Sequence, residues 1–252
     1  MNTIKVIKKI KAYAIRLKVH KVLGFSANLL IYSGYLIKLS KWADKNKSKL
    51  KYNDFYNRKV VHKERLEMYD VYTSETGLKS EAINYFEFGV GRGNALRWWS
   101  SINENPETIY WAFDTYEGLP EKYGTYAAGT FSQEGNFPQI DDQRIRFIKG
   151  LFQDTLLHEI PKVDFHKKSV IHIDGDLYSS ALFSLSMLYP YMKKGDVIIF
   201  DEFVVPAHEY KAYEDFIKSF YIKLKPIGAI NNYLQVIFEI EEIKEHPYFL
   251  NP

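Results

Sequence analysis

The chain of 252 residues contains no cysteine. Disulfide bonds, thiolate metal sites and cysteine nucleophiles are therefore excluded. The N-terminus lacks an apolar core followed by a small-residue cleavage site, so no cleavable secretion signal is expected and a cytoplasmic location is the default. Val22–Ile37, a stretch without any charge, has 16 residues. That is short of the roughly 20 apolar residues that a membrane-spanning helix needs.

Acidic residues are scarce in the first 51 positions. Residues 1–51 hold 13 Lys/Arg and one acid, Asp44, and sum to +12. The remainder holds 34 − 13 = 21 bases and 31 − 1 = 30 acids, and sums to −9. Such an asymmetry indicates two parts with different roles. We predict a basic amphipathic helical arm over residues 1–51 and a folded domain over residues 52–252.

The arm has two pieces. In residues 3–21, lysines and apolar residues follow each other at helical spacing, which predicts a basic amphipathic helix. With the uncharged stretch that follows, this pattern is typical of a peripheral contact with an anionic membrane, here through residues 1–40 at the inner face of the membrane. The alternative is an arm that packs on the domain or on a second subunit, in a homodimer or higher oligomer. Since no RNA- or DNA-binding motif accompanies the basic residues, no nucleic-acid partner is expected.

Apolar residues are plentiful in the domain, and from Asn84 onward strand-like and helix-like segments alternate. This alternation is typical of an α/β fold with a mostly parallel sheet and helices on both faces. The last two strands read as a hairpin that adds an antiparallel C-terminal edge. The predicted strands are 85–88, 108–113, 145–148, 169–173, 196–200, 222–229 and 233–238. Residues 58–80 read as helical, and residues 117–143 as a long functional loop.

Residues 85–93 read Tyr-Phe-Glu-Phe-Gly-Val-Gly-Arg-Gly, a strand that runs into a turn with glycine at every second position. Glycine this dense allows a backbone to turn sharply or to lie against a cofactor. A dinucleotide fingerprint has the spacing G-x-G-x-x-G, whereas here the third glycine comes one residue early and Asn94 takes its place. Asp114 ends the next predicted strand, where an acid can accept both ribose hydroxyls of a bound cofactor.

Two acidic pairs end the next parallel strands. Asp174 and Asp176 follow one strand, and Asp201 and Glu202 follow the other. Carboxyl ends of parallel strands meet at one edge, so these four residues, here called the acidic cluster, are expected to lie together. Carboxylates can hold a hard cation such as Mg²⁺. Without a metal, Asp176 or a nearby histidine, His172 or His208, can act as general base. A purely structural role would be helix capping by Asp176 and Asp201.

Five ordered blocks of residues together resemble the macrocin O-methyltransferase family, which includes the mycinamicin and novobiocin sugar O-methyltransferases. The blocks are residues 86–93, 113–120, 141–155, 172–178 and 195–202. The resemblance covers roughly residues 84–238 and leaves the basic arm out. It implies a class I methyltransferase fold, Rossmann-like with a seven-stranded sheet, in a domain that uses S-adenosylmethionine. It also implies a hydroxyl acceptor on a sugar or glycan, and assistance by Mg²⁺.

The resemblance also implies roles for particular residues. The metal carboxylates fall on Asp174, Asp201 and position 202, where Glu202 replaces the family's aspartate. The residues at and near the strand ends, taken by themselves, supply the catalytic candidates Asp174, Asp176, His172 and His208. The cofactor-binding candidates are Glu87, Gly89, Val90, Gly91, Arg92, Gly93, Asp114, Thr115 and Gly150.

Two other functions fit parts of this pattern. Asp174-Gly175-Asp176 matches the D-x-D motif by which glycosyltransferases hold a nucleotide-sugar through a divalent cation. The glycine turn followed by Asp114 argues against this reading, because such enzymes do not need that cradle. A third hypothesis is a non-catalytic binding protein on the same fold. The acidic cluster argues against it, because an inactive site has no reason to keep four carboxylates that repel one another.

Overall fold

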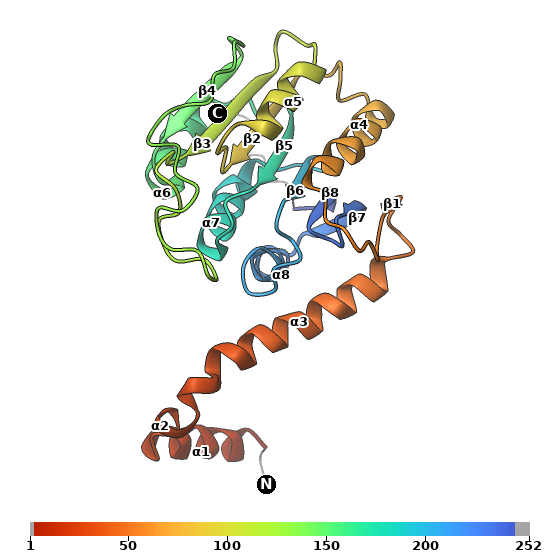
Figure 1. Cartoon of the computed structure of the whole chain (residues 1–252). Helices are drawn as coiled ribbons and strands as arrows, with labels where there is room; N and C mark the ends of the chain where they lie inside the picture. Colours follow the sequence, from red (N-terminus) through yellow and green to blue (C-terminus); the bar gives the residue numbers. More distant parts are fainter. Residues whose placement is uncertain (1–2, 245–252) are drawn as a thin grey trace.

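The structure is a computed structural model, and it describes residues 3–244. An N-terminal helical arm projects away from an α/β domain (Figure 1). The arm comprises α1 (Thr3–Arg16), α2 (His20–Leu23), the 3₁₀ helix η1 (Gly24–Ser26) and α3 (Ala27–Asn46). The later part of α3 anchors the arm to the domain: Leu39 and Trp42 are buried, and the Trp42 indole donates a hydrogen bond to the Tyr213 hydroxyl at 3.1 Å.

One mixed sheet forms the centre of the domain, with strand order β1-β7-β8-β6-β5-β2-β3-β4. The strands are β1 (Tyr52–Asn53), β2 (Ile83–Phe88), β3 (Ile109–Asp114), β4 (Ile145–Lys149), β5 (Lys168–Ile173), β6 (Val197–Phe200), β7 (Lys223–Ile230) and β8 (Gln235–Glu242). Strands β4, β3, β2, β5 and β6 are parallel, and β8 pairs antiparallel with both β6 and β7. The predicted parallel sheet with an antiparallel edge is confirmed.

The predicted count of seven strands is wrong, because the described sheet has eight. The additional strand is β1, two residues that follow the arm and pair in parallel with β7 at Gly228 and Ala229. Gly228 permits the approach: a Cβ there would lie 3.0 Å from the Tyr52 ring. A pair this short carries no periodicity, so the sequence pattern could not reveal it.

Most other strand boundaries differ from the predicted ones by one or two residues, and β8 ends at Glu242, four residues after the predicted end. Two differences have a clear physical cause. Strand β8 begins at Gln235 rather than at position 233, because Asn231, Asn232 and Tyr233 adopt left-handed φ values of 55°, 60° and 68° and form the turn. The helix predicted over residues 58–80 is confined to the 3₁₀ helix η2 (His62–Glu64) and to α4 (Arg65–Thr76). Gly77, with φ 75°, ends α4 in the left-handed conformation that glycine adopts without strain.

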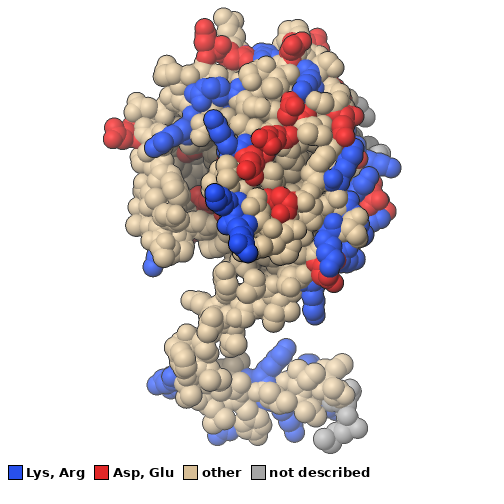
Figure 2. All heavy atoms as spheres, turned by 45° about the vertical axis from the view of Figure 1, so that its right-hand side comes forward, with Lys and Arg blue, Asp and Glu red and all other residues tan. Residues whose placement is uncertain are grey.

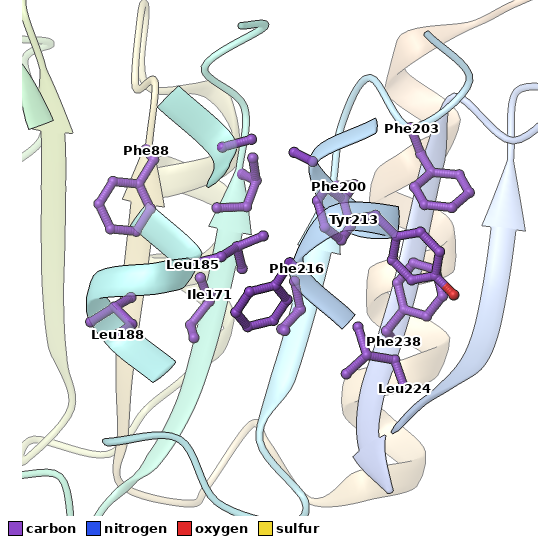
Figure 3. Packing of buried hydrophobic residues seen from close by; sticks show 14 of the residues in the cluster. Phe88, Ile171, Leu185, Leu188, Phe200, Phe203, Tyr213, Phe216, Leu224 and Phe238 are labelled. Atoms are coloured by element: carbon purple, nitrogen blue, oxygen red, sulfur yellow. The ribbon is translucent and has the colours of Figure 1, made fainter. Parts of the chain in front are cut away.

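Helices cover both faces of the sheet (Figure 1). Helices α4 and α5 (Asn94–Ile102) pack on one face, and α6 (Phe152–Glu159), α7 (Tyr178–Leu188) and α8 (Glu209–Ser219) on the other. Short 3₁₀ helices η3 (Ile160–Lys162) and η4 (Tyr189–Tyr191) follow α6 and α7. Figure 3 shows the core between the sheet and the second group of helices, where Leu185 of α7 and Phe216 of α8 lie over Ile171 and Phe200 of the sheet. Each such side chain contributes about 1.5–3 kcal/mol on burial.

The register of the parallel strands brings four strand ends together. Phe88 of β2 is level with Phe113 of β3 and with Ile173 of β5, which is level with Phe200 of β6. The next residues along the chain are Gly89, Asp114, Asp174 and Asp201. The glycine turn, the Asp114 carboxylate and the acidic cluster therefore meet at one edge of the sheet, as the strand pattern predicts.

Candidate functional site

A cavity of about 690 Å³ opens at this edge. Of the predicted site residues, it is lined by Glu87, Gly89, Val90, Gly91, Arg92, Asp114, Thr115, Asp174, Asp176, Asp201 and Glu202. Gly93, Gly150, His172 and His208 are not among its lining residues. The long loop contributes aromatic side chains, Tyr123, Tyr126 and Phe131, to the opposite wall. Aromatic faces of this kind can stack on the rings of a cofactor or a sugar.

The glycine turn packs tightly at Gly89. Its φ is 101°, and a Cβ there would lie 2.0 Å from the backbone oxygen of Asp174. Gly91, which lines the cavity, has φ 50° and no atom within 4 Å of its Cβ position. Gly93 serves the fold instead: it precedes α5 with φ 72°, and a Cβ would meet Pro138 at 2.9 Å.

Asp114 fastens the turn to the end of β3. Its Oδ2 accepts the Gly91 amide at 2.7 Å, and its Oδ1 accepts the Tyr116 amide at 2.6 Å. A carboxylate oxygen has more than one acceptor site, so Asp114 can still receive ribose hydroxyls from the cavity. Thr115 bonds the Gly118 carbonyl through its hydroxyl at 2.9 Å, and the Gly150 amide donates to the Asp114 carbonyl at 3.0 Å.

The fit to S-adenosylmethionine rests on this turn. Gly91 leaves space that a side chain would fill, and the Asp114 carboxylate stands beside it at the cavity wall. A backbone this close to a cavity, with an acid at the end of the next strand, suits the ribose and amino-acid parts of such a cofactor. The residues present therefore fit this group.

The acidic cluster is held by an arginine that the sequence did not single out. Arg65, the first residue of α4, places Nη1 2.5 Å from Asp201 Oδ2 and 3.9 Å from Asp174 Oδ2. Burial raises the pKa of Asp174, and the Asp201 charge adds to this effect. Asp201 keeps a pKa below its usual value: burial opposes ionisation, but His172 and Arg65 stabilise the carboxylate more strongly.

His172 lies below the cavity and is fully buried. Its Nδ1 lies 2.8 Å from the Tyr85 hydroxyl, which donates to Glu87 at 2.7 Å, and its Nε2 is 3.5 Å from Asp201 Oδ1. Neither Nε2 nor Oδ1 has a hydrogen bond of normal length. Within residues 3–244, donor atoms of His172, Asp174 and Asp201 lie within 4.8 Å of one another, and no group with Glu202 meets this criterion. The orphaned buried atoms make this group a fit for a cation.

Asp176 and Glu202 lie on the open side of the cluster. Asp176 adopts φ 58°, a left-handed conformation that costs energy in a residue other than glycine. Despite this backbone strain, residue 176 is an aspartate, and it lines the cavity. Burial and the charge of Asp201 raise the pKa of Asp176 to about 6 and that of Glu202 to about 8.

His208 stands behind the cavity wall. Its Nδ1 is 3.4 Å from the Tyr178 amide, and its ring meets the edge of Tyr123 at 4.7 Å between centroids. Burial lowers the pKa of His208, so the imidazole is neutral at pH 7. In this arrangement His208 touches the cavity through Tyr123, whereas the catalytic candidates Asp174 and Asp176 line it.

Three polar residues beneath or beside the site were not predicted from the sequence: Arg65, Tyr85 and Glu209. Glu209 is fully buried at the start of α8, and its Oε2 accepts the Glu202 amide at 2.9 Å. Burial raises its pKa well above the usual value. Tyr85 could have been suspected, because a tyrosine two residues before Glu87 points to the same face of a strand.

Glu87 should destabilise the domain as pH rises. Burial raises its pKa from 4.5 to about 8. The unfolded chain therefore binds fewer protons than the folded domain between these values, and stability falls with increasing pH. We expect Glu87→Gln to stabilise the domain by about 1 kcal/mol at pH 5.5 and about 3 kcal/mol at pH 7.5. Urea unfolding without cofactor at both pH values measures this.

The matched control for this substitution is Glu134→Gln, which removes the same charge from an exposed loop position. Its stability should follow that of the unmodified chain at both pH values. A gain for Glu87→Gln that does not change with pH would contradict the raised pKa.

A model of the macrocin-O-methyltransferase (TylF) family matches residues 57–237, more than half of the chain. The chain belongs to the macrocin-O-methyltransferase family. The resemblance drawn from the five sequence blocks is thus confirmed. The family match begins after the arm, close to the point where β1 joins the sheet.

Two curated relatives of this family member are O-methyltransferases. Mycinamicin III 3''-O-methyltransferase of Micromonospora griseorubida is 35% identical over 154 residues, 50% of this chain and 59% of the relative. A tetracenomycin-rhamnosyl 4'-O-methyltransferase of Streptomyces olivaceus is 30% identical over 152 residues, 50% of this chain and 56% of the relative. The chain thus spans little more than half the length of these relatives.

Solved structures agree on the fold of this family member. The O-methyltransferase NovP superposes with a TM-score of 0.52 at 21% identity, over 71% of this chain and 79% of that one. The calicheamicin methyltransferase CalS11 gives a TM-score of 0.54 at 18% identity, over 71% and 80% of the two chains. The predicted α/β class I methyltransferase fold is confirmed.

Proposed function

We propose that this macrocin-O-methyltransferase family member transfers the methyl group of S-adenosylmethionine to a hydroxyl of a sugar or glycan, with assistance from Mg²⁺. The observation that carries the proposal is the shared cavity: the Gly89–Gly93 turn and Asp114 border it on one side, and the acidic cluster on the other. The names of the relatives support the acceptor class, because one is an O-methyltransferase of a rhamnosyl-tetracenomycin and the other of mycinamicin III.

Each side of the cavity has a separate task in this reaction. Gly91 and Asp114 hold the cofactor, which when bound supplies the methyl group. Asp174, Asp201 and Glu202 are the candidate metal ligands, and a bound Mg²⁺ would supply positive charge beside the acceptor hydroxyl. Asp176 takes the hydroxyl proton. Tyr123 and Tyr126 of the long loop exclude water and orient the sugar, so that much of the acceleration comes from alignment.

Calorimetry tests the proposal against the glycosyltransferase alternative. S-adenosylhomocysteine should bind to the protein. A nucleotide-sugar should bind more weakly than S-adenosylhomocysteine, unless it is itself the sugar that receives the methyl group. A panel of deoxysugar glycosides and nucleotide-sugars, incubated with S-adenosylmethionine labelled in its methyl group, should show label on one of them. Tight binding of a nucleotide-sugar without binding of S-adenosylhomocysteine would favour the glycosyltransferase instead.

The arm supports a location at an anionic membrane. Its helix α1 has no buried residue, and large apolar side chains along the arm are open to solvent, for example Ile15 at 79% and Phe25 at 89%. Figure 2 shows basic side chains on the projecting arm and no acidic ones on the face in view, and residues 1–43 contain no acid. Apolar and basic residues without acids are complementary to a bilayer with negative headgroups.

The arm is proposed to lie in the interface rather than to cross the bilayer. Within residues 3–244, the helical stretch His20–Asn46 is long and apolar enough to cross a membrane by length and composition. It extends beyond the 16 uncharged residues of Val22–Ile37 on both sides. However, basic residues flank the uncharged stretch on both sides, Lys18 and Lys21 before it and Lys38 and Lys41 after it. A crossing would carry one basic flank to the far side, against the positive-inside rule.

Vesicle co-sedimentation tests this contact. The full chain should bind vesicles containing phosphatidylglycerol, and binding should weaken as salt rises. Replacement of Lys5, Lys8, Lys9 and Lys11 by glutamine should weaken binding about 100-fold or more at low salt, since each lysine near an anionic surface contributes about 1 kcal/mol. The control replaces the exposed Lys59, Lys162, Lys194 and Lys218 of the domain.

Equal loss in both vesicle-binding variants would contradict a contact made by the arm. Vesicle binding that is indifferent to salt would contradict the role of the lysines, and a lack of vesicle binding would favour an arm that packs on a second copy of the chain. The homodimer or higher oligomer stays a prediction, and sedimentation velocity of the full chain in detergent-free buffer tests it.

A further inference from the structure

Arg65 occupies an unusual position for a basic residue. It is the first residue of α4, at the positive end of the helix dipole, where a cation is disfavoured. Its side chain is 13% exposed and reaches into the cavity edge beside His62. The cost of this placement is offset by Asp201 at 2.5 Å and Asp174 at 3.9 Å.

The surrounding fold holds Arg65 in place. Four residues earlier, the Val61 amide donates to Asn231 Oδ1 at 2.8 Å, and Asn231 Nδ2 returns a bond to the Val61 carbonyl at 3.2 Å. Asn231 also bonds Gln235 at 2.9 Å, and Gln235 donates to the Asp201 carbonyl at 3.1 Å. The turn between β7 and β8 therefore positions Arg65 and Asp201 together.

The charge balance leaves room for a further cation. Four carboxylates line this end of the cavity, and Arg65 is the one Lys or Arg in residues 3–244 that forms an ion pair with Asp174 or Asp201. His172 Nε2 and Asp201 Oδ1, both buried, lack hydrogen-bond partners and lie 3.5 Å apart. The residues that Arg65 contacts are the same two acids that share the close donor group with His172.

We propose that Arg65 and a divalent cation compete for the carboxylates of Asp174 and Asp201, so that Arg65 is a positioning residue that sets the metal affinity of the site. The inference rests on the metal site of the proposed function. Arg65 Nη1 donates a hydrogen bond to Asp201 Oδ2, and an oxygen that receives a guanidinium proton is a weaker metal ligand. The same Nη1 lies 3.9 Å from Asp174 Oδ2 and pairs with it through charge alone. Its positive charge also repels a cation at this distance. The arginine thus keeps the carboxylates ordered and limits how tightly metal binds.

Titration of Mg²⁺ and Mn²⁺ into the protein with S-adenosylhomocysteine tests this competition without any methyl transfer. Arg65→Gln should bind both ions about tenfold more tightly or better, because it loses the competing charge. Its melting temperature should rise with added metal by more than that of the unmodified chain. Arg58→Gln, which removes the same charge from an exposed position outside the cavity, should behave like the unmodified chain.

Unchanged or weaker metal binding by Arg65→Gln would overturn the proposal. If this variant folds only when metal is added, that dependence agrees with it. If the variant does not fold at any metal concentration, Arg65→Lys decides: the shorter side chain holds its charge farther from the Asp174 and Asp201 carboxylates, so metal affinity should rise severalfold, and no rise overturns the proposal. Since only binding and melting are measured, failure to find an acceptor leaves this test intact.

Discussion

Replacing Asp176 with asparagine is expected to lower kcat by about 10²–10⁴-fold, the usual contribution of a positioned general base. Asparagine has the same shape and tolerates the left-handed conformation that residue 176 adopts, with φ 58°. The substitution therefore removes the proton acceptor with little change in the backbone. The affinity for S-adenosylhomocysteine, measured by calorimetry, should stay within about threefold of that of the unmodified chain. The substitution leaves the residues assigned to the cofactor, Gly91 and Asp114, unchanged.

The pH profile separates this role from a structural one. Burial raises the pKa of Asp176 to about 6, and the group accepts a proton only when ionised. In the unmodified chain kcat should therefore fall as pH drops below about 6, and this acidic limb should be absent from Asp176→Asn. Asp164→Asn, an exposed loop substitution outside the cavity, is the control and should keep the limb. An acidic limb that survives in Asp176→Asn would assign the proton to another group.

Gly89→Ala is expected to destabilise the domain by about 3 kcal/mol or more, through the combined cost of a left-handed alanine and a steric clash. The added Cβ would lie 2.0 Å from the Asp174 carbonyl oxygen, a backbone atom that cannot move away alone. The strain would separate β2 from β5 at the point where the cofactor turn meets the acidic cluster. For a domain of about 200 residues, the melting temperature should fall by about 6–12 °C.

Gly91→Ala provides the matched comparison, because it lies two residues away in the same turn. Its φ is 50° and nothing lies within 4 Å of the Cβ position. Only the conformational cost of about 1–2 kcal/mol applies to its stability. Instead, the methyl group would enter the space assigned to the cofactor, so S-adenosylhomocysteine binding should suffer more than stability. Equal melting temperatures for the two variants would contradict the close contact at Gly89.

Much of the site could be predicted because its signals are local. Glycine at positions 89 and 91 indicates a backbone with positive φ, and both have it. The acids at 114, 174 and 201 each follow a strand, and parallel strands end at one edge. These two rules place the cofactor turn and the acidic cluster in one cavity without knowledge of any contact between distant residues.

The sequence by itself determined the family, the fold class and the two sides of the cavity. Only the tertiary structure decided which side chains contact one another at the cavity. Arg65 and Asp201 are 136 residues apart, and no spacing rule relates a helix start to a strand end. Likewise, His172 lies below the floor rather than in the cavity, because its side of β5 faces the core under α4, beside Tyr69 and Tyr85. Such contacts depend on how helices pack on the sheet, which periodicity does not encode.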